Sequence, residues 1–565
     1  MVTLNWGLIS SEKKSNTKPS DNREYDFRIS VAKEVTSQIA DHQKRKILKI
    51  ITDEFKTFRY MKRYSFKNQD GTCRFDLSIV KSSFEPVKAI SASDVFTKAS
   101  PIYEIEIESI GDHIPIDILT SEIKLVLKYL QDTEYPLSKA YRLQLFQDYI
   151  SSFFKQKRSD DVAYGSSRMS RFFLGAMPVS LTLENVVPLD VVEGAASVNI
   201  RKKYPDDYTV TEKADGDRQL LYVNSSRDVF LISRQMTFTY TGLCGSKPQT
   251  LIDGEWLKDS HRFLAFDMLF ADNRDLRMLP LMRSRPTKIN ESHQLGRIDI
   301  LERLLSNPLS FSPRDPQERH LNLGVKKHWT VPETLLFKKA GELWKHRLSL
   351  FKYNIDGIFF TPRAGKYPMT EKGSSTWRSC VKWKPRSLLS IDFQVFSRSD
   401  IRFHLQTDQA KNEIMMPYRV CHLHVQSPNQ RFDKNMTHKP RFNKPDVILF
   451  SPTHDHTDIG RPAPHIARIL TDDAHKMIAI DPITSQKNYF QHGDIVEFVY
   501  DSSAESGYEW KPIRVRSDKT VPNSARTAQQ VWSVIHEANG LITDDQFFEL
   551  IQEKSTDQIL RDQYI

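Results

Sequence analysis

A lysine inside an acidic turn is the residue of this chain best suited to covalent chemistry. Lys213 lies in the run E-K-A-D-G-D-R at residues 212–218, just ahead of an apolar stretch. An amine is nucleophilic only when it is unprotonated, so a catalytic lysine needs a lowered pKa or an electron-poor, metal-bound target. Asp215 could hold a metal or orient the amine, and Gly216 lets the backbone approach a phosphate closely. Because K-x-D-G recurs by chance, a mixed-charge surface turn is the competing interpretation.

Further polar residues follow Lys213 within short apolar runs or at either end of them, and we expect these runs to be strands. They are Ser233-Arg234, Asp253-Gly254-Glu255, Phe266-Asp267, Asp356-Gly357, Lys382-Trp383-Lys384 and the R-x-R-x-D-K run at residues 514–519. Strand ends can converge polar groups on one pocket. The set supplies a nucleophile, carboxylates for a divalent metal, an aromatic ring for a base and cations for phosphates. Attack on the α-phosphate of a nucleotide requires this inventory.

The ordered set resembles the covalent nucleotidyltransferases, which include mRNA capping guanylyltransferases and ATP-dependent DNA or RNA ligases. The final R-x-R-x-D-K run and the stretch G-A-M-P-V-S-L at residues 175–181 are similar to the capping branch. The resemblance covers about residues 172–525 and implies a nucleotidyltransferase α+β domain followed by an OB-fold domain.

The same resemblance implies a role for each matched residue. Lys213 would form a lysyl-N-phosphoramidate with GMP taken from GTP. The nucleotide would be bound by Arg218, Arg234, Glu255, Phe266, Asp356, Lys382, Lys384, Arg514, Asp518 and Lys519. The last three would reach the outgoing pyrophosphate from the OB-fold domain, which requires that domain to close and reopen. Ser233 stands where capping enzymes often carry an aspartate, so the expected ribose contact of Arg234 is less secure.

Acidic residues alternate along two N-terminal segments. Glu104, Glu106 and Glu108 would share one face of a strand, where three like charges are costly unless cations neutralise them. Residues 24–28 repeat the alternation, and basic residues lie between the two segments. Two acidic strands facing basic ones would make a site for a metal and a triphosphate. A solvated face of an edge strand is the alternative.

These segments resemble the triphosphate tunnel metalloenzymes, which are metal-dependent RNA 5′-triphosphatases with an antiparallel β tunnel. That resemblance implies metal ligands at Glu24, Asp26, Glu104, Glu106 and Glu108 and triphosphate contacts at Arg63, Arg74 and Lys81. Asp26 departs from the usual glutamate. The implied metal is Mg or Mn.

The fused order resembles the bifunctional capping enzymes of large DNA viruses. The implied substrates are 5′-triphosphate RNA and GTP, and the implied partners are a viral RNA polymerase or a methyltransferase domain or subunit. The implied location is the host cytoplasm or the virion. Only 45 residues follow residue 520 (565 − 520), too few for a methyltransferase domain of about 250 residues. We therefore expect a fragment or a divergent two-activity form.

Length and composition agree with a multidomain α+β protein. A chain of 565 residues is too long to fold around a single hydrophobic core. We expect a triphosphatase domain at 1–165, a nucleotidyltransferase domain at 166–386, an OB-fold domain at 387–525 and a helical linker at 526–565. The net charge of +10 suits a polyanion such as RNA. No apolar run has membrane-spanning length, and four scattered cysteines argue against a disulfide framework.

Two other functions compete with capping. An ATP-dependent polynucleotide ligase shares the lysine set, but the R-x-R-x-D-K run and the acidic N-terminal strands argue against it. A non-catalytic RNA-binding scaffold could keep the fold, but the intact Lys213, Glu255, Lys382 and Lys384 argue against that.

Overall fold

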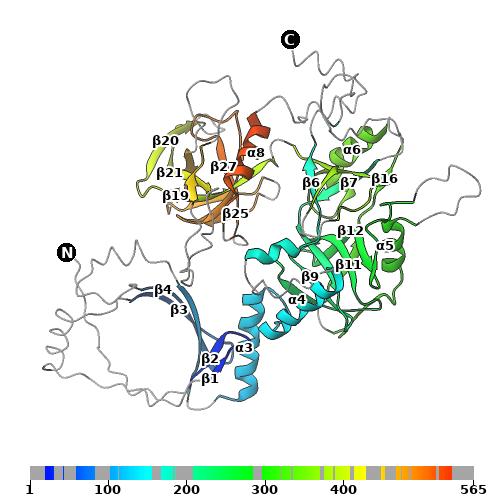
Figure 1. Cartoon of the computed structure of the whole chain (residues 1–565). Coiled ribbons are helices and arrows are strands. Elements are labelled where there is room, and N and C mark those ends of the chain that lie inside the picture. The colour runs from blue at the N-terminus through cyan, green and yellow to red at the C-terminus, as the bar shows by residue number, and fades with distance from the viewer. Residues whose placement is uncertain are drawn as a thin grey trace, which may run out of the picture.

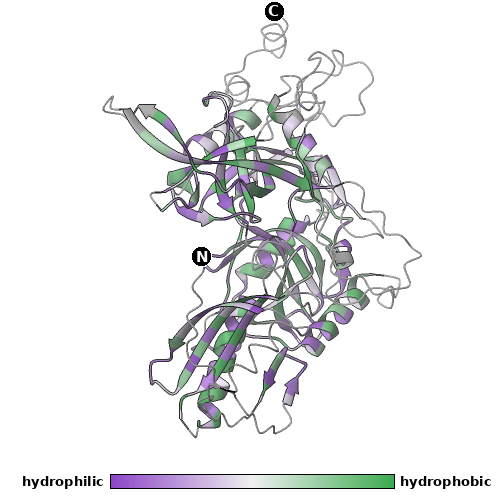
Figure 2. Ribbon diagram, turned by 90° about the vertical axis from the view of Figure 1, so that its left-hand side faces the viewer, coloured by the Kyte–Doolittle hydropathy of each residue, from purple (hydrophilic) through white to green (hydrophobic). Residues whose placement is uncertain are grey.

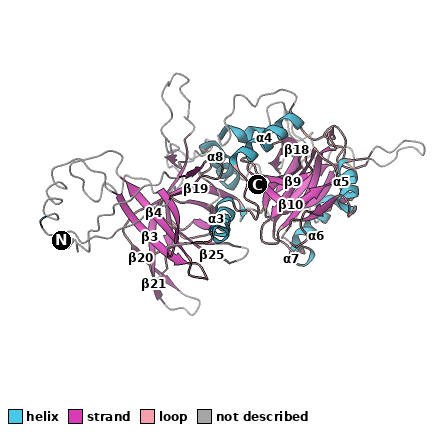
Figure 3. Cartoon of the chain, turned by 90° about the horizontal axis from the view of Figure 1, so that it is seen from below, coloured by secondary structure: helices cyan, strands magenta, loops and turns pink. Residues whose placement is uncertain are grey.

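Strands make up most of the regular structure, and the predicted multidomain α+β class is confirmed (Figures 1 and 3). The computed structural model describes residues 20–30, 42, 59–82, 102–111, 114–154, 167–181, 185, 208–283, 295–317, 320–331, 335–369, 375–385, 388–407, 413–427, 447–451, 466–472, 474–482, 485–516, 519 and 521–536. Within these ranges, no helix has both the length and the apolar character needed to cross a membrane.

The N-terminal strands form two small antiparallel sheets. One sheet contains β3 (Arg59–Lys67), β4 (Cys73–Ser82) and β5 (Ile102–Ser109) in that order, and the other pairs β1 (Ser20–Asn22) with β2 (Phe27–Ile29). The turn between β3 and β4 contains Gly71 with φ of 67°, in the left-handed region that favours glycine. As far as these strands are described they make an open sheet, so the closed tunnel stays a prediction.

Two helices connect the N-terminal sheet to the central region. They are α3 (Ile116–Gln131) and α4 (Lys139–Phe153). The Ser138 side chain caps α4 by accepting a hydrogen bond from the Tyr141 N–H at 3.2 Å. Phe146, Tyr149 and Phe153 of α4 are buried in the core of the larger central sheet. Although the expected boundary at residue 165 assigns α4 to the N-terminal domain, its apolar face packs on the central one.

The central region contains two sheets. The larger has the order β13-β12-β11-β8-β9-β10-β14 with β15 beside β12, and the smaller has the order β16-β7-β17-β18-β6. The elements are a 3₁₀ helix (Ser167–Phe172), β6 (Met177–Ser180), β7 (Tyr208–Ala214), β8 (Asp217–Val223), β9 (Asp228–Ile232), β10 (Phe238–Gly245), β11 (Thr250–Leu257), β12 (Arg262–Ala271), β13 (Arg274–Asp275), α5 (Arg297–Ser306), β14 (Phe311–Pro313), β15 (Asn322–Val325), β16 (Trp329–Thr330), α6 (Leu336–Lys345), α7 (Arg347–Leu350), β17 (Ile355–Pro362) and β18 (Thr376–Trp383). Hydrophobic and hydrophilic residues are interspersed along the ribbon as a whole (Figure 2), but β8 and β9 in the middle of the larger sheet are buried almost throughout, as expected for strands covered on both faces. Helix α4 packs on one face of the larger sheet, α5 on the other, and α6 on the smaller sheet.

The C-terminal region is a third, mostly antiparallel group of strands. Its main sheet has the order β20-β21-β19-β26-β27, with β22 and β23 paired to β21. The elements are β19 (Ser390–Ser397), β20 (Arg402–Thr407), β21 (Glu413–Gln426), β22 (Val447–Leu449), β23 (Ile466–Leu470), β24 (Met477–Ile480), β25 (Lys487–Phe490), β26 (Ile495–Tyr500), β27 (Trp510–Val515) and α8 (Ala525–His536). Trp532 of α8 stacks on Trp510 at 5.6 Å between ring centres, so α8 belongs to this core. The OB-fold assignment stays a prediction.

Candidate active site

Strand pairing brings the sequence-distant residues of the lysine motif together. Lys213 lies near the end of β7, directly opposite Gly357 of β17, and Lys382 of β18 lies opposite Phe359 of β17. Asp356 and Lys384 therefore arrive on neighbouring strands. Gly357 is required sterically, because a Cβ there would lie 2.1 Å from the Trp383 carbonyl oxygen.

Two lysines share the carboxylate of Asp356. The Nζ of Lys213 donates a hydrogen bond to Oδ1 at 2.6 Å, and the Nζ of Lys384 lies 2.5 Å from Oδ2. Burial favours the neutral acid, but the two lysines outweigh it and lower the pKa of Asp356. Burial likewise opposes charge on Lys213, but Asp356 and Glu255 outweigh it and raise the pKa of Lys213. The Lys213 amine is thus held as an ammonium. A lowered pKa of the lysine is therefore not how it is activated in this structure, which leaves a metal-bound, electron-poor phosphate as the alternative.

Two further groups of this cluster have strongly shifted protonation. Burial, together with the charges of Lys213 and Lys384, lowers the pKa of Lys382 to about 8. Burial raises the pKa of Glu255 to about 7, although Lys213 and Lys326 pull it down. Both groups therefore change charge near neutral pH, which is common at sites that bind or react with charged ligands.

Arg218 and Phe266 lie side by side on the larger sheet. The Arg218 guanidinium forms a bidentate pair with Asp253, with contacts of 3.0 and 2.5 Å, and its Cζ lies 5.5 Å from the ring centre of Phe266. Arg234, which follows β9, is an exposed residue, and desolvation by the surrounding protein, followed by the charge of Arg218, lowers its pKa. Gly216, in the turn between β7 and β8, is required by packing, since a Cβ there would lie 2.7 Å from the Trp256 carbonyl oxygen.

Lys326 is a site residue that the sequence analysis missed. It is buried, and its Nζ lies 5.7 Å from the ring centre of Phe266 and 3.7 Å from the carboxylate of Glu212. It follows β15, which pairs in parallel with β12 and so reaches the strand that carries Phe266. A single lysine after a four-residue strand has no sequence pattern that could have identified it.

The C-terminal cations are held by carboxylates. Arg514 of β27 lies 3.3 Å from Asp215 of the lysine motif and 3.2 Å from Asp481. Lys519 pairs with the buried Asp392 instead. The pairing with Asp215 places one predicted C-terminal residue beside the motif, whereas Asp518 lies outside the described residues.

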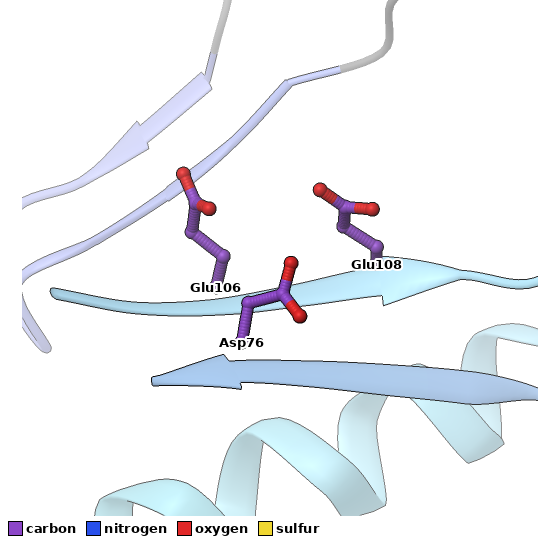
Figure 4. A group of neighbouring side chains, drawn as sticks. All are labelled: Asp76, Glu106 and Glu108. Atoms are coloured by element: carbon purple, nitrogen blue, oxygen red, sulfur yellow. The ribbon is translucent and has the colours of Figure 1, made fainter. Parts of the chain in front are cut away.

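Three carboxylates gather on the N-terminal sheet (Figure 4). Asp76 of β4 and Glu106 and Glu108 of β5 have carboxylate oxygens within 4.8 Å of one another. Arg63 bonds to Asp76 at 2.9 Å and to Glu106 at 2.6 Å, and Arg74 bonds to Asp76 at 3.1 Å and to Glu108. Glu104 shares this face and pairs with Arg59. Asp76 was not among the predicted ligands, although its R-x-D spacing with Arg74 already put both on one face.

Three N-terminal residues are placed differently from expectation. Glu24 and Asp26 lie in a turn between β1 and β2 rather than on a strand, so the alternation at residues 24–28 was misleading. Glu24 accepts a hydrogen bond from the Ala140 N–H at 2.9 Å, and Asp26 pairs with Lys139, so both are engaged at the start of α4. Lys81 lies an odd number of residues from Arg74 on an unbulged strand, which puts it on the opposite face of the sheet.

Comparison with known proteins gives consistent matches along most of the chain. The family model for the mRNA capping enzyme, catalytic domain, matches residues 145–386, and that for the mRNA capping enzyme, C-terminal domain, matches residues 390–540. A probable mRNA-capping enzyme of Acanthamoeba polyphaga mimivirus is 24% identical over 550 residues, covering 86% of this chain and 41% of the relative. The mRNA-capping enzyme subunit alpha of Schizosaccharomyces pombe is 27% identical over 277 residues, covering 42% of this chain and 58% of the relative. An African swine fever virus mRNA-capping enzyme is 24% identical over 208 residues, covering 37% of this chain and 21% of the relative. The chain spans about two fifths of the length of the mimivirus relative.

Proposed function

Because the chain belongs to the mRNA capping enzyme family, we propose that it transfers GMP from GTP to the diphosphate end of RNA through Lys213. The observation that carries the proposal is the buried cluster in which Lys213 and Lys384 flank Asp356, with Lys382 and Glu255 beside them. A nucleophilic amine, cations for phosphates and carboxylates for a metal lie within one site.

The proposed reaction has two displacements at the same phosphorus. In the first, the neutral Nζ of Lys213 attacks the α-phosphorus of GTP, an N–P bond forms, and the bond to the bridging oxygen breaks to release pyrophosphate. In the second, an oxygen of the RNA β-phosphate attacks that phosphorus, and the N–P bond breaks to return the amine. Lys382 and Lys384 would offset the phosphate charge in both steps. Asp356 already accepts a hydrogen bond from the amine and so orients it, and the amine proton is released to solvent as the N–P bond forms.

The carboxylates of this cluster fit a hard divalent cation. Glu255 and Asp356 offer oxygen ligands, which Mg and Mn prefer, and both interact electrostatically with the Lys213 amine. A bound divalent cation would offset the negative charge that holds the proton on Lys213 and would stabilise charge that develops on the phosphate.

Labelling with α-phosphate-labelled nucleotides tests the guanylyl transfer. The wild-type chain with a divalent metal should acquire an acid-labile label from GTP but not from ATP, and Lys213→Ala should acquire none. A label from ATP alone would identify a polynucleotide ligase instead. If neither nucleotide labels the protein, the scaffold hypothesis would replace both.

We further propose that the N-terminal sheet removes the γ-phosphate from triphosphate-ended RNA before that transfer. Support comes from Asp76, Glu106 and Glu108, whose oxygens suit Mg or Mn, and from Arg63 and Arg74, whose guanidinium groups suit phosphates. The Ser65 hydroxyl, followed by Arg74 and Arg63, lowers the pKa of Asp76, so this carboxylate stays charged. Release of γ-phosphate from triphosphate-ended RNA, measured with and without metal, tests this step.

The biological setting follows from the family. The mimivirus and African swine fever virus relatives support a large-DNA-virus origin. RNA and GTP are the substrates we propose, the host cytoplasm or virion is the proposed place of action, and a viral RNA polymerase or a methyltransferase is the proposed partner.

A further inference from the structure

A buried tyrosine outside the lysine motif joins four separate segments behind the candidate site. Tyr367, in the loop after β17, donates its hydroxyl proton to Asp253 at 2.6 Å and accepts a hydrogen bond from the Ala176 N–H at 2.8 Å. The Nη2 of Arg218 also lies 3.3 Å from this hydroxyl oxygen. Tyr367 is 2% exposed and Asp253 is fully buried, so water cannot replace these bonds.

The partners of Tyr367 also hold Arg218 from other directions. Asp253 receives two N–H groups of Arg218, and the Ala176 carbonyl oxygen receives a third at 2.6 Å. The Tyr367 hydroxyl thus contacts the Asp253 carboxylate, the backbone at Ala176 and the Arg218 guanidinium. Burial and the Asp253 carboxylate raise the pKa of Tyr367 well above its ordinary value, so the phenol keeps the proton it donates.

The loop that carries Tyr367 is itself anchored. Arg297 of α5 is fully buried, pairs with Asp267 at 2.7 Å and donates to the Gly365 carbonyl oxygen at 2.9 Å. Its Cζ lies 5.7 Å from the Tyr367 ring centre. Because Asp267 follows Phe266 on β12, one buried arginine fixes both the aromatic strand and the tyrosine loop.

We propose that Tyr367 is a positioning residue that sets the orientation of Arg218, and hence the affinity of the site for GTP. The inference rests on the proposed function, in which Arg218 contacts the nucleotide. Without the phenol, Asp253 loses a charge-assisted bond, so the carboxylate and the guanidinium paired with it are held less firmly in their present orientation. The Lys213–Asp356–Lys384 cluster is not touched by this change, so the maximal rate of adduct formation should change less than the GTP requirement.

Tyr367→Phe tests the proposal because it removes only the hydroxyl and keeps the ring. The concentration of GTP that half-saturates adduct formation should rise by about tenfold, the effect of one lost hydrogen bond to a charged group. Tyr149→Phe is the matched control, since the Tyr149 hydroxyl is equally buried in the same core but donates to the Phe172 carbonyl oxygen at 2.9 Å. The control should lower the melting temperature similarly and leave the GTP requirement unchanged.

A double-mutant cycle separates positioning from general support. If Tyr367 acts through Arg218, Tyr367→Phe should add little in an Arg218→Lys background, whereas additive effects would overturn the proposal. An unchanged half-saturating GTP concentration in Tyr367→Phe would overturn it as well. If Tyr367→Phe does not fold, the proposal fails, because the phenol would then be needed for stability. A wild-type chain that takes no label from GTP would instead contradict the proposed function.

Discussion

The two charged clusters of this molecule differ in their access to water. Around Asp356 the side chains are enclosed, with 9% of Asp356 and 18% of Lys213 exposed, whereas Glu106 and Glu108 are 46% and 45% exposed on the N-terminal sheet. Burial disfavours the charged forms of Lys382 and Glu255, which lowers the pKa of the lysine and raises the pKa of the glutamate. On the more exposed N-terminal sheet, water screens the carboxylates, and Arg63 and Arg74 pair directly with Glu106 and Glu108. The comparison indicates that the central site is built to set protonation states, and the N-terminal site to balance charge.

The largest expected effect tests whether the two clusters work independently. Glu106→Ala should reduce γ-phosphate release from triphosphate-ended RNA by about 100-fold, since one of the proposed metal ligands is lost, while GTP labelling persists. Lys213→Ala should abolish GTP labelling and leave phosphate release intact. Both activities are measured on the same preparations. Equal loss of both activities in either variant would mean that the sites are coupled.

A pH profile tests the effect of enclosure on Lys382. This lysine contributes to phosphate binding only as a cation, and its pKa of about 8 means that the cation is complete below pH 8 and is lost as pH rises through that value. The affinity for GTP, measured without divalent metal so that the adduct-forming step of Lys213 does not contribute, should therefore fall above pH 8, by about tenfold per pH unit at the steepest. Lys382→Arg should remove this fall, because a guanidinium stays charged. A fall that persists in the arginine variant would assign it to another group.

The two faces of the N-terminal sheet provide a matched pair of basic substitutions. Arg74→Ala should slow phosphate release by about tenfold or more, because Arg74 bonds to two of the clustered carboxylates. Lys81→Ala should change the rate by less than about twofold, since Lys81 lies on the opposite face. Steady-state rates at saturating metal distinguish the two. Comparable losses would show that both faces contribute to the site.

The smallest effect is expected for the exposed pair at the start of α4. Asp26→Asn should leave metal-dependent phosphate release unchanged and lower stability by less than about 1 kcal/mol, as for other exposed ion pairs. The melting temperature and the metal concentration for half-maximal rate are the measurements. A large increase in that metal concentration would restore the original assignment of Asp26 as a ligand.

The lysine site was more predictable from sequence than the N-terminal one, and the reason is physical. Lys213 lies near the end of a strand, Asp356 near the start of one and Lys384 directly after one, and adjacent pairing of those strands was enough to bring them together. Lys326 escaped detection because its relevance comes only from the parallel pairing of β15 with β12.

In the N-terminal sheet, alternation decided the outcome. It correctly grouped Glu104, Glu106 and Glu108, and applied consistently it also groups Arg74 with Asp76 and excludes Lys81. Alternation alone could not show that residues 23–26 turn instead of extending, because a short stretch of acidic and apolar residues fits both conformations.

Helix α4 has a consequence for dissecting the protein. Its residues Phe146, Tyr149 and Phe153 fill one face of the larger central sheet, and each contributes about 1.5–3 kcal/mol through burial. A recombinant fragment that starts at residue 166 would lack α4, so the hydrophobic face of the larger central sheet would be exposed to water and the fragment should aggregate on expression. A fragment that starts ahead of Lys139 keeps the helix and should be the shortest one that remains in solution and still takes up guanylate.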